Sequence, residues 1–162
     1  MKEFREEQRF TQIFVWVILI APMVMVLSQF VMVLTDDKGI QDEDIITLIS
    51  ISIIFTGLIV WFRRLVLQTS VTEQGIKIHY RGLFTKKNFP KADILKAELV
   101  TYDPLWNYGG WGLRYSSKRG WCYNVAGDKG LKLTMSNGKV VMIGTQKTDE
   151  LNSALTSMHY PV

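Results

Sequence analysis

Two long apolar runs stand near the start of the chain. Ile13 to Leu34 contains 22 residues without a charge, and Ile45 to Phe62 contains 18. At about 1.5 Å per residue, helices of these lengths match or approach the roughly 30 Å of a hydrocarbon core. We therefore expect two membrane-spanning helices, over about 13–34 and 45–62. A cleaved signal peptide is disfavoured, because residues 2–9 mix both charge signs and no A-x-A pattern ends the first run.

Charged residues flank the two runs unequally. The linker 35–44 holds five acidic residues and one lysine, whereas five cations lie at the other ends of the runs: Lys2, Arg5, Arg9, Arg63 and Arg64. Because basic flanks stay inside, we expect a multi-pass protein of the cell membrane with both termini cytoplasmic. Trp16, Trp61, Arg63 and Arg64 then lie at the cytoplasmic membrane interface, where indole rings and snorkelling cations are favoured.

The apolar runs contain few polar residues. In an antiparallel pair with Leu34 level with Ile45, Gln29 and Ser50 lie at the same depth. An amide among apolar side chains needs a hydrogen-bond partner, so we expect Gln29 and Ser50 to form an interhelical polar contact. A transport path is disfavoured because neither run contains an acidic or basic residue.

Beyond Arg64 the pattern changes to short stretches separated by glycine and turn residues. It predicts about seven strands, from eight candidate ranges: 65–71, 76–80, 86–89, 94–102, 113–115, 121–125, 131–135 and 139–143. The Asn137-Gly138 dipeptide favours a type I′ hairpin turn between the last two. Leu151, Leu155 and Met158 recur at helical spacing and predict a closing amphipathic helix.

These elements predict an α+β membrane protein. A transmembrane hairpin with its N-terminal tail, 1–66, precedes a β-rich domain, 67–162. The chain resembles small bacterial membrane proteins with two N-terminal transmembrane helices and a pleckstrin-homology-like (PH-like) domain. The resemblance is carried by Glu6 to Phe10, by Tyr108 to Arg114 and by Gly130 to Gly144. It implies a partly open β-barrel or meander capped by a helix, a docking or scaffolding role, and no reaction.

Composition and charge narrow the functional classes. With 48% apolar and 21% charged residues, the chain is not a disordered tail. Residues 67–162 hold 13 Lys and Arg against seven Asp and Glu. Two local clusters supply candidate contacts for anionic lipid head groups or a membrane-associated protein: Arg114, Tyr115, Lys118, Arg119 and Trp121, and Lys86 with Lys87. The alternative is a solvated turn. Nucleic acid is not expected, because each cluster has few cations.

Catalytic signatures are missing from the sequence. Cys122, the single cysteine, has no cationic neighbour in sequence, and the two histidines lack the spacing of a zinc site. The glycines between 109 and 112 lack the ending of a phosphate loop and favour a turn. We therefore expect no metal, no cofactor and a non-enzymatic interaction module. One alternative is an accessory subunit that packs through its helices into a larger membrane complex; another is an enzyme that uses Cys122.

Overall fold

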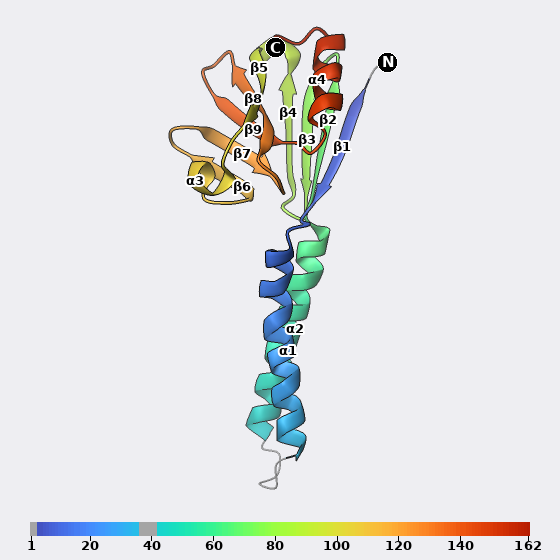
Figure 1. Cartoon of the computed structure of the whole chain (residues 1–162), viewed down its shortest axis with the longest axis vertical. Helices are drawn as coiled ribbons and strands as arrows, with labels where there is room; N and C mark the ends of the chain where they lie inside the picture. The colour runs from blue at the N-terminus through green and yellow to red at the C-terminus, as the bar shows by residue number, and fades with distance from the viewer. Residues whose placement is uncertain (1–2, 36–41) are drawn as a thin grey trace. The chain divides into compact units, whose positions relative to one another are not determined.

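The computed structural model describes residues 3–35 and 42–162, which form two compact units (Figure 1). The helical unit comprises the described residues of 11–64. The β unit comprises residues 3–10 together with 65–162. The sequence analysis instead placed the domain boundary between residues 66 and 67, and it grouped the N-terminal tail with the helices rather than with the β unit.

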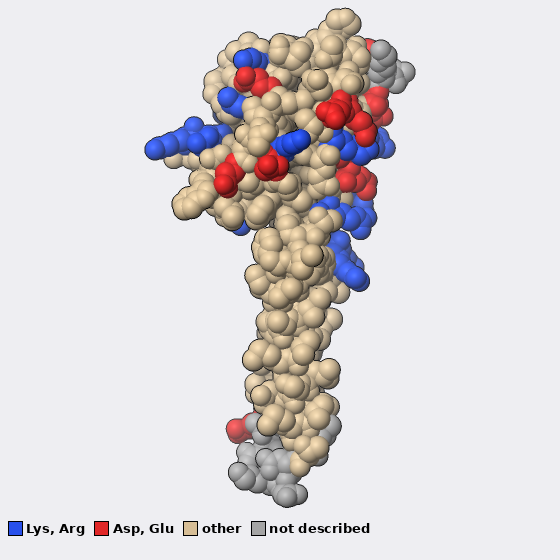
Figure 2. Space-filling model, viewed as in Figure 1, with Lys and Arg blue, Asp and Glu red and all other residues tan. Residues whose placement is uncertain are grey.

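The helical unit consists of α1 (Ile13–Thr35) and α2 (Asp42–Arg64), which contact each other. Both helices are long and apolar enough to span a membrane, with mean hydropathy of 2.3 and 2.5 over their most apolar windows. Most of their side chains face outward; Met25 and Ile53 are each 67% exposed. Figure 2 shows almost no charged side chains along the described part of the helices, except at their ends.

One sheet of the β unit is antiparallel and follows the strand order β1-β2-β3-β4. Its strands are β1 (Phe4–Arg9), β2 (Val66–Thr72), β3 (Gly75–Arg81) and β4 (Thr85–Pro90). Strand β1 precedes α1 and pairs with β2, which follows α2; Phe4 lies opposite Val71, and Arg9 opposite Val66. The chain therefore leaves the β unit after β1 and returns to it at the neighbouring strand β2, with both helices in between.

A second sheet follows the order β5-β8-β9-β7-β6. Its strands are β5 (Ile94–Thr101), β6 (Gly112–Ser116), β7 (Gly120–Asn124), β8 (Lys129–Met135) and β9 (Val140–Gly144). The β7–β9 pair is parallel and the other pairs are antiparallel. Three short helices complete the unit: η1 (Lys91–Asp93), α3 (Pro104–Tyr108) and α4 (Thr148–Ser157).

The core of the β unit lies between its sheets and under α4. Leu67, Ile76 and Leu131 are almost fully buried. The predicted apolar stripe of the C-terminal helix is confirmed: Leu151, Leu155 and Met158 are all buried. At about 1.5–3 kcal/mol per buried large aliphatic side chain, this packing dominates the stability of the unit.

The structure corrects three sequence-based expectations. The described residues form nine strands in two sheets rather than about seven strands in a single barrel. The unexpected β1 alternates buried and exposed positions, but its inward residues include Glu6 and Gln8, so no apolar alternation marks it. The Asn137-Gly138 turn is also not of type I′, because only Gly138 has positive φ and Met135 N donates to Lys139 O across a three-residue loop.

Candidate functional site: a basic and aromatic groove

A groove of about 460 Å³ opens between edge strand β4, the β6–β7 hairpin and the β8–β9 turn. We call it the basic groove. Its cations come from all three segments: Lys87, Lys118, Arg119 and Lys139. Its aromatic residues are Phe89, Tyr115, Trp121 and Tyr123. None of the described residues that line it is acidic, so the groove has a positive electrostatic potential.

The β6–β7 hairpin holds the aromatic wall in place. Tyr115 and Trp121 are direct cross-strand partners whose ring centroids lie 5.1 Å apart, and Trp121 stacks on Tyr123 at 6.4 Å. Such pairs stabilise a two-stranded ribbon and fix the orientation of its rings. Tyr115 is nevertheless 61% exposed and Trp121 44% exposed. Both rings therefore retain free surface for a ligand.

Close backbone packing positions the hairpin tip. Gly120 has a φ of +76°, and a Cβ atom there would overlap the carbonyl oxygen of Val140. Arg119 N donates to Ser116 O at 3.2 Å, which closes the turn and leaves the side chains of Lys118 and Arg119 in solvent. Figure 2 shows basic side chains projecting from the side of the β unit on which this hairpin lies.

The structure brings together part of each cluster predicted from sequence. Lys87 joins Tyr115, Lys118, Arg119 and Trp121 around one groove. Two residues of the predicted set lie elsewhere. Arg114 does not line the groove, and its Nε donates to the Trp111 carbonyl at 3.1 Å. Lys86 points to the opposite face of β4, opposite His79.

Among the cationic and aromatic residues that line the groove, sequence reasoning missed three: Phe89, Tyr123 and Lys139. Lys139 reaches the groove because β9 pairs in parallel with β7, with Trp121 opposite Val141. A parallel pairing between segments separated by another strand leaves no local signal in the sequence. Phe89 and Tyr123 lie within predicted strands, but the surface to which each side chain contributes depends on how the two sheets meet.

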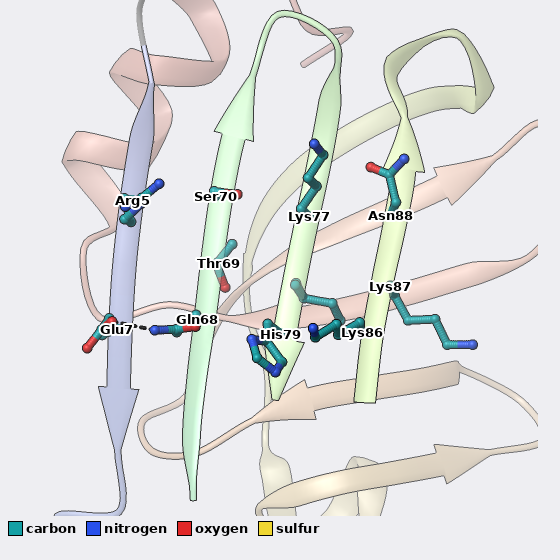
Figure 3. A pocket seen from close by; sticks show the side chains of 11 residues that line it. Arg5, Glu7, Gln68, Thr69, Ser70, Lys77, His79, Lys86, Lys87 and Asn88 are labelled. Atoms are coloured by element: carbon teal, nitrogen blue, oxygen red, sulfur yellow. Dashed lines mark hydrogen bonds between the residues drawn. The ribbon is translucent and has the colours of Figure 1, made fainter. Parts of the chain in front are cut away.

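The solvent-facing side of the β1–β4 sheet forms a second polar surface, which we call the outer face (Figure 3). Two rows cross it in register: Arg5, Ser70, Lys77 and Asn88, then Glu7, Gln68, His79 and Lys86. Gln68 Nε2 donates to Glu7 Oε1 at 2.5 Å. Partial removal from water, with Lys86 and Arg81 nearby, lowers the pKa of His79 and favours its neutral form. Unlike the basic groove, this surface contains an acidic residue.

Cys122 lies inside the β unit. It is fully buried beside Tyr102, and burial raises the pKa of its thiol to about 12, although a hydrogen bond with Tyr102 partly opposes the shift. The thiolate that nucleophilic chemistry requires is therefore disfavoured. Among the described residues, no group of three His, Cys, Asp or Glu side chains could hold a metal ion.

The predicted interface residues lie at one end of the helical unit. Trp16 is in the first turns of α1, and Trp61, Arg63 and Arg64 are in the last turns of α2. Trp61 contacts Phe62 edge to face at 5.4 Å. Arg63 and Arg64 carry positive charge at the C-terminus of α2, where the helix dipole favours it.

The structure shows no hydrogen bond between the described residues Gln29 and Ser50. The hydroxyl of Ser50 donates to the Ile46 carbonyl of its own helix at 2.7 Å. Gln29 is exposed, and no described residue hydrogen-bonds with its side chain. The polar residues that line the cleft between the two helices are instead Ser52 and Thr56.

The described residues that line the basic groove include four cations and no acidic residue, whereas Cys122 is buried outside the groove and its thiolate form is disfavoured. Comparison with known proteins adds no family to this description: no family model matches the chain, and neither a curated protein nor a solved structure is similar to it.

Proposed function

We propose that this chain is a non-enzymatic, membrane-anchored interaction module. In this proposal the two helices span the cell membrane, both termini are cytoplasmic, and the basic groove binds an acidic segment of a membrane-associated protein. The β unit is proposed to be a divergent PH-like domain, because its strands are followed by one C-terminal helix that packs on the core.

The exposed apolar faces of α1 and α2 support anchoring in a bilayer. Apolar surface in water costs about 25 cal/mol per Å², and soluble proteins rarely expose it over whole helices. Pairing of β1 with β2 supports placing the N-terminal strand and the β unit on one side. The basic residues beside the helix ends, against an acidic linker, support assigning that side to the cytoplasm.

One observation carries the proposed docking role: four cations and four aromatic residues from three separate segments line one groove without an acidic residue. Tyr, Trp and Arg side chains dominate the binding energy of many protein interfaces. A bilayer surface is flat on this scale and cannot meet every wall of a groove. An extended acidic segment can enter it and can also meet the free edge of β4.

The test is co-purification of the full-length protein in mild detergent. We expect the double variant Lys118→Gln and Arg119→Gln to lose its partner, by up to about 30-fold in affinity if each exposed ion pair contributes about 1 kcal/mol. The matched control is Arg5→Gln with Lys77→Gln, which removes the same charge from the outer face. Equal partner recovery by all three proteins would refute docking at the groove. If the groove variant kept its protein partner and lost only co-purified anionic lipid, the ligand of the groove would be a lipid head group.

A second candidate, an accessory subunit that packs through its helices, is favoured by Gln29. Its amide is exposed on α1 without a partner among the described residues, and an amide in lipid gains by bonding to another helix. Partner loss in Gln29→Leu, with retention in the groove variant, would favour this candidate over the groove.

A further inference from the structure

We propose that the β3–β4 turn, with Phe84 at its tip, inserts into the membrane interface and holds one end of the β unit against the bilayer. This inference rests on the proposed membrane anchoring but is independent of the ligand of the basic groove. It assigns a lipid contact to Phe84, a residue outside the contact residues predicted from the sequence.

Phe84 is held in an unfavourable environment. Its side chain is 93% exposed, the largest exposed fraction of any large apolar side chain among the described residues. Its φ of +51° is in the left-handed region, which residues with a Cβ atom rarely adopt. Leu83 N donates to Tyr80 O at 3.3 Å, and the Thr85 hydroxyl donates to Leu83 O at 3.2 Å. The turn therefore keeps an aromatic ring away from the core.

Register places this turn at the end of the sheet that joins the helices. Arg9 lies opposite Val66, and Val66 lies opposite Arg81, the last residue of β3. Only Leu65 separates Val66 from the end of α2 at Arg64. Two residues of extended chain span at most about 7 Å, so this end of the sheet stays close to the helix terminus.

The surrounding residues indicate a lipid partner. Arg9, Arg81 and Lys86 lie on the strands around the turn, and Arg63 and Arg64 end α2. Aromatic rings flanked by cations are favoured at the level of the lipid head groups, where the ring meets the acyl boundary and the cations meet phosphates. Trp106, 89% exposed, lies on α3, toward the same end of the β unit (Figure 1).

Fluorescent labels at single cysteines test the contact in the full-length protein. In a Cys122→Ala background, an environment-sensitive label is attached at Phe84→Cys, or at Glu73→Cys in the β2–β3 turn at the other end of the same sheet. Met25→Cys on α1 reports helix insertion. The proteins are reconstituted in phosphatidylcholine–phosphatidylglycerol vesicles with and without spin-labelled lipid. Unfolding curves confirm that each variant retains its fold.

We expect the label at position 84 to be blue-shifted and quenched by spin-labelled lipid, and the label at position 73 to be unaffected. Because a label can itself prefer lipid, a second probe at Leu83→Cys compares Phe84 with Phe84→Asp; the aspartate should reduce quenching. If position 84 behaves like position 73 while position 25 is quenched, the turn does not touch the bilayer and only this inference fails. If position 25 is not quenched, membrane anchoring itself is refuted.

Discussion

The Thr145 hydroxyl donates a hydrogen bond of 2.7 Å to Oε2 of Glu6, a residue 139 positions earlier. The other carboxylate oxygen of Glu6 accepts from Gln146 N at 2.7 Å. Next to it, Gln8 Nε2 donates to the Gly144 carbonyl at 2.6 Å. The strand before the first helix is thereby fastened to the segment between β9 and α4.

Replacing Glu6 should therefore destabilise the β unit strongly. Glu6→Ala leaves the buried Thr145 hydroxyl without an acceptor for its proton and removes two charge-assisted bonds, a loss of about 2–3 kcal/mol in the free energy of unfolding. Glu7→Ala removes the same charge from the exposed side of the same strand and should cost within about 0.5 kcal/mol. Chemical unfolding of the full-length protein in detergent measures both; equal effects would contradict the fastening role.

The two glycines of the groove hairpins should respond differently to alanine. Both have positive φ, but a Cβ atom at Gly120 overlaps Val140 O, whereas nothing lies within 4 Å of one at Gly138. Gly138→Ala should cost about 1–2 kcal/mol from backbone conformation alone. Gly120→Ala should cost clearly more and should weaken partner binding, since it separates β7 from β9. Thermal unfolding measures the loss of stability in each variant. Equal losses would show that the β6–β7 hairpin can move away from Val140 without destabilising the protein.

Cys122 should be unreactive in the folded protein. A thiol with a pKa of about 12 is ionised roughly a thousandfold less at pH 8 than an ordinary one, so labelling by a disulfide reagent should be slower by at least that factor than after denaturation. Fast labelling of the native protein would reopen the hypothesis of a catalytic cysteine.

The same group makes stability depend on pH. Since the pKa of Cys122 is raised in the folded state, its contribution is complete below the ordinary thiol value of 9.0 and is lost as the pH rises toward 12. Unfolding free energies measured across this range should fall, and less steeply in Cys122→Ala. Burial also raises the pKa of Tyr102, so this residue supplies part of the pH dependence of stability that remains in Cys122→Ala. Identical slopes would show that the thiol does not contribute.

Gln29→Leu should leave the stability of the helical unit unchanged. No described residue hydrogen-bonds with the Gln29 side chain, and interhelical hydrogen bonds in lipid contribute only about 0.6 kcal/mol on average. Detergent-dependent unfolding measures the effect, with Ser52→Ala in the cleft between the helices as the comparison. Strong destabilisation would indicate that Gln29 bonds within the chain.

Local signals predicted much of the fold. Continuous apolar runs identified both helices, because apolar residues occupy almost every position of the two runs. Glycine and turn residues located eight of the strands, and the spacing of Leu151, Leu155 and Met158 identified α4. The short α3 also had readable signals, an N-cap at Asp103 followed by Pro104 and a left-handed Gly109, but it has no apolar periodicity.

Long-range partners explain what the sequence did not reveal. Glu6 and Gln8 look like solvent-exposed residues in the sequence because the groups with which they form hydrogen bonds lie more than 130 positions away. The candidate site was predicted as two separate charge clusters. Lys87 and Lys118 meet at one groove only because edge strand β4 approaches a hairpin of the other sheet, and no local pattern encodes that approach.

Pairing of β1 with β2 also constrains how the protein is made. During synthesis β1 leaves the ribosome before either helix, and its partner strand follows only after both. If the helices enter a bilayer, the sheet can close only when the chain has crossed it twice. If only the first helix inserted, β1 and β2 would lie on opposite sides of the membrane, with Glu6 and Gln8 unpaired and the edge of β2 open. The pairing of β1 with β2 would thus require correct insertion of both helices, and it would also complete the sheet. Misinserted chains would be exposed to proteolysis.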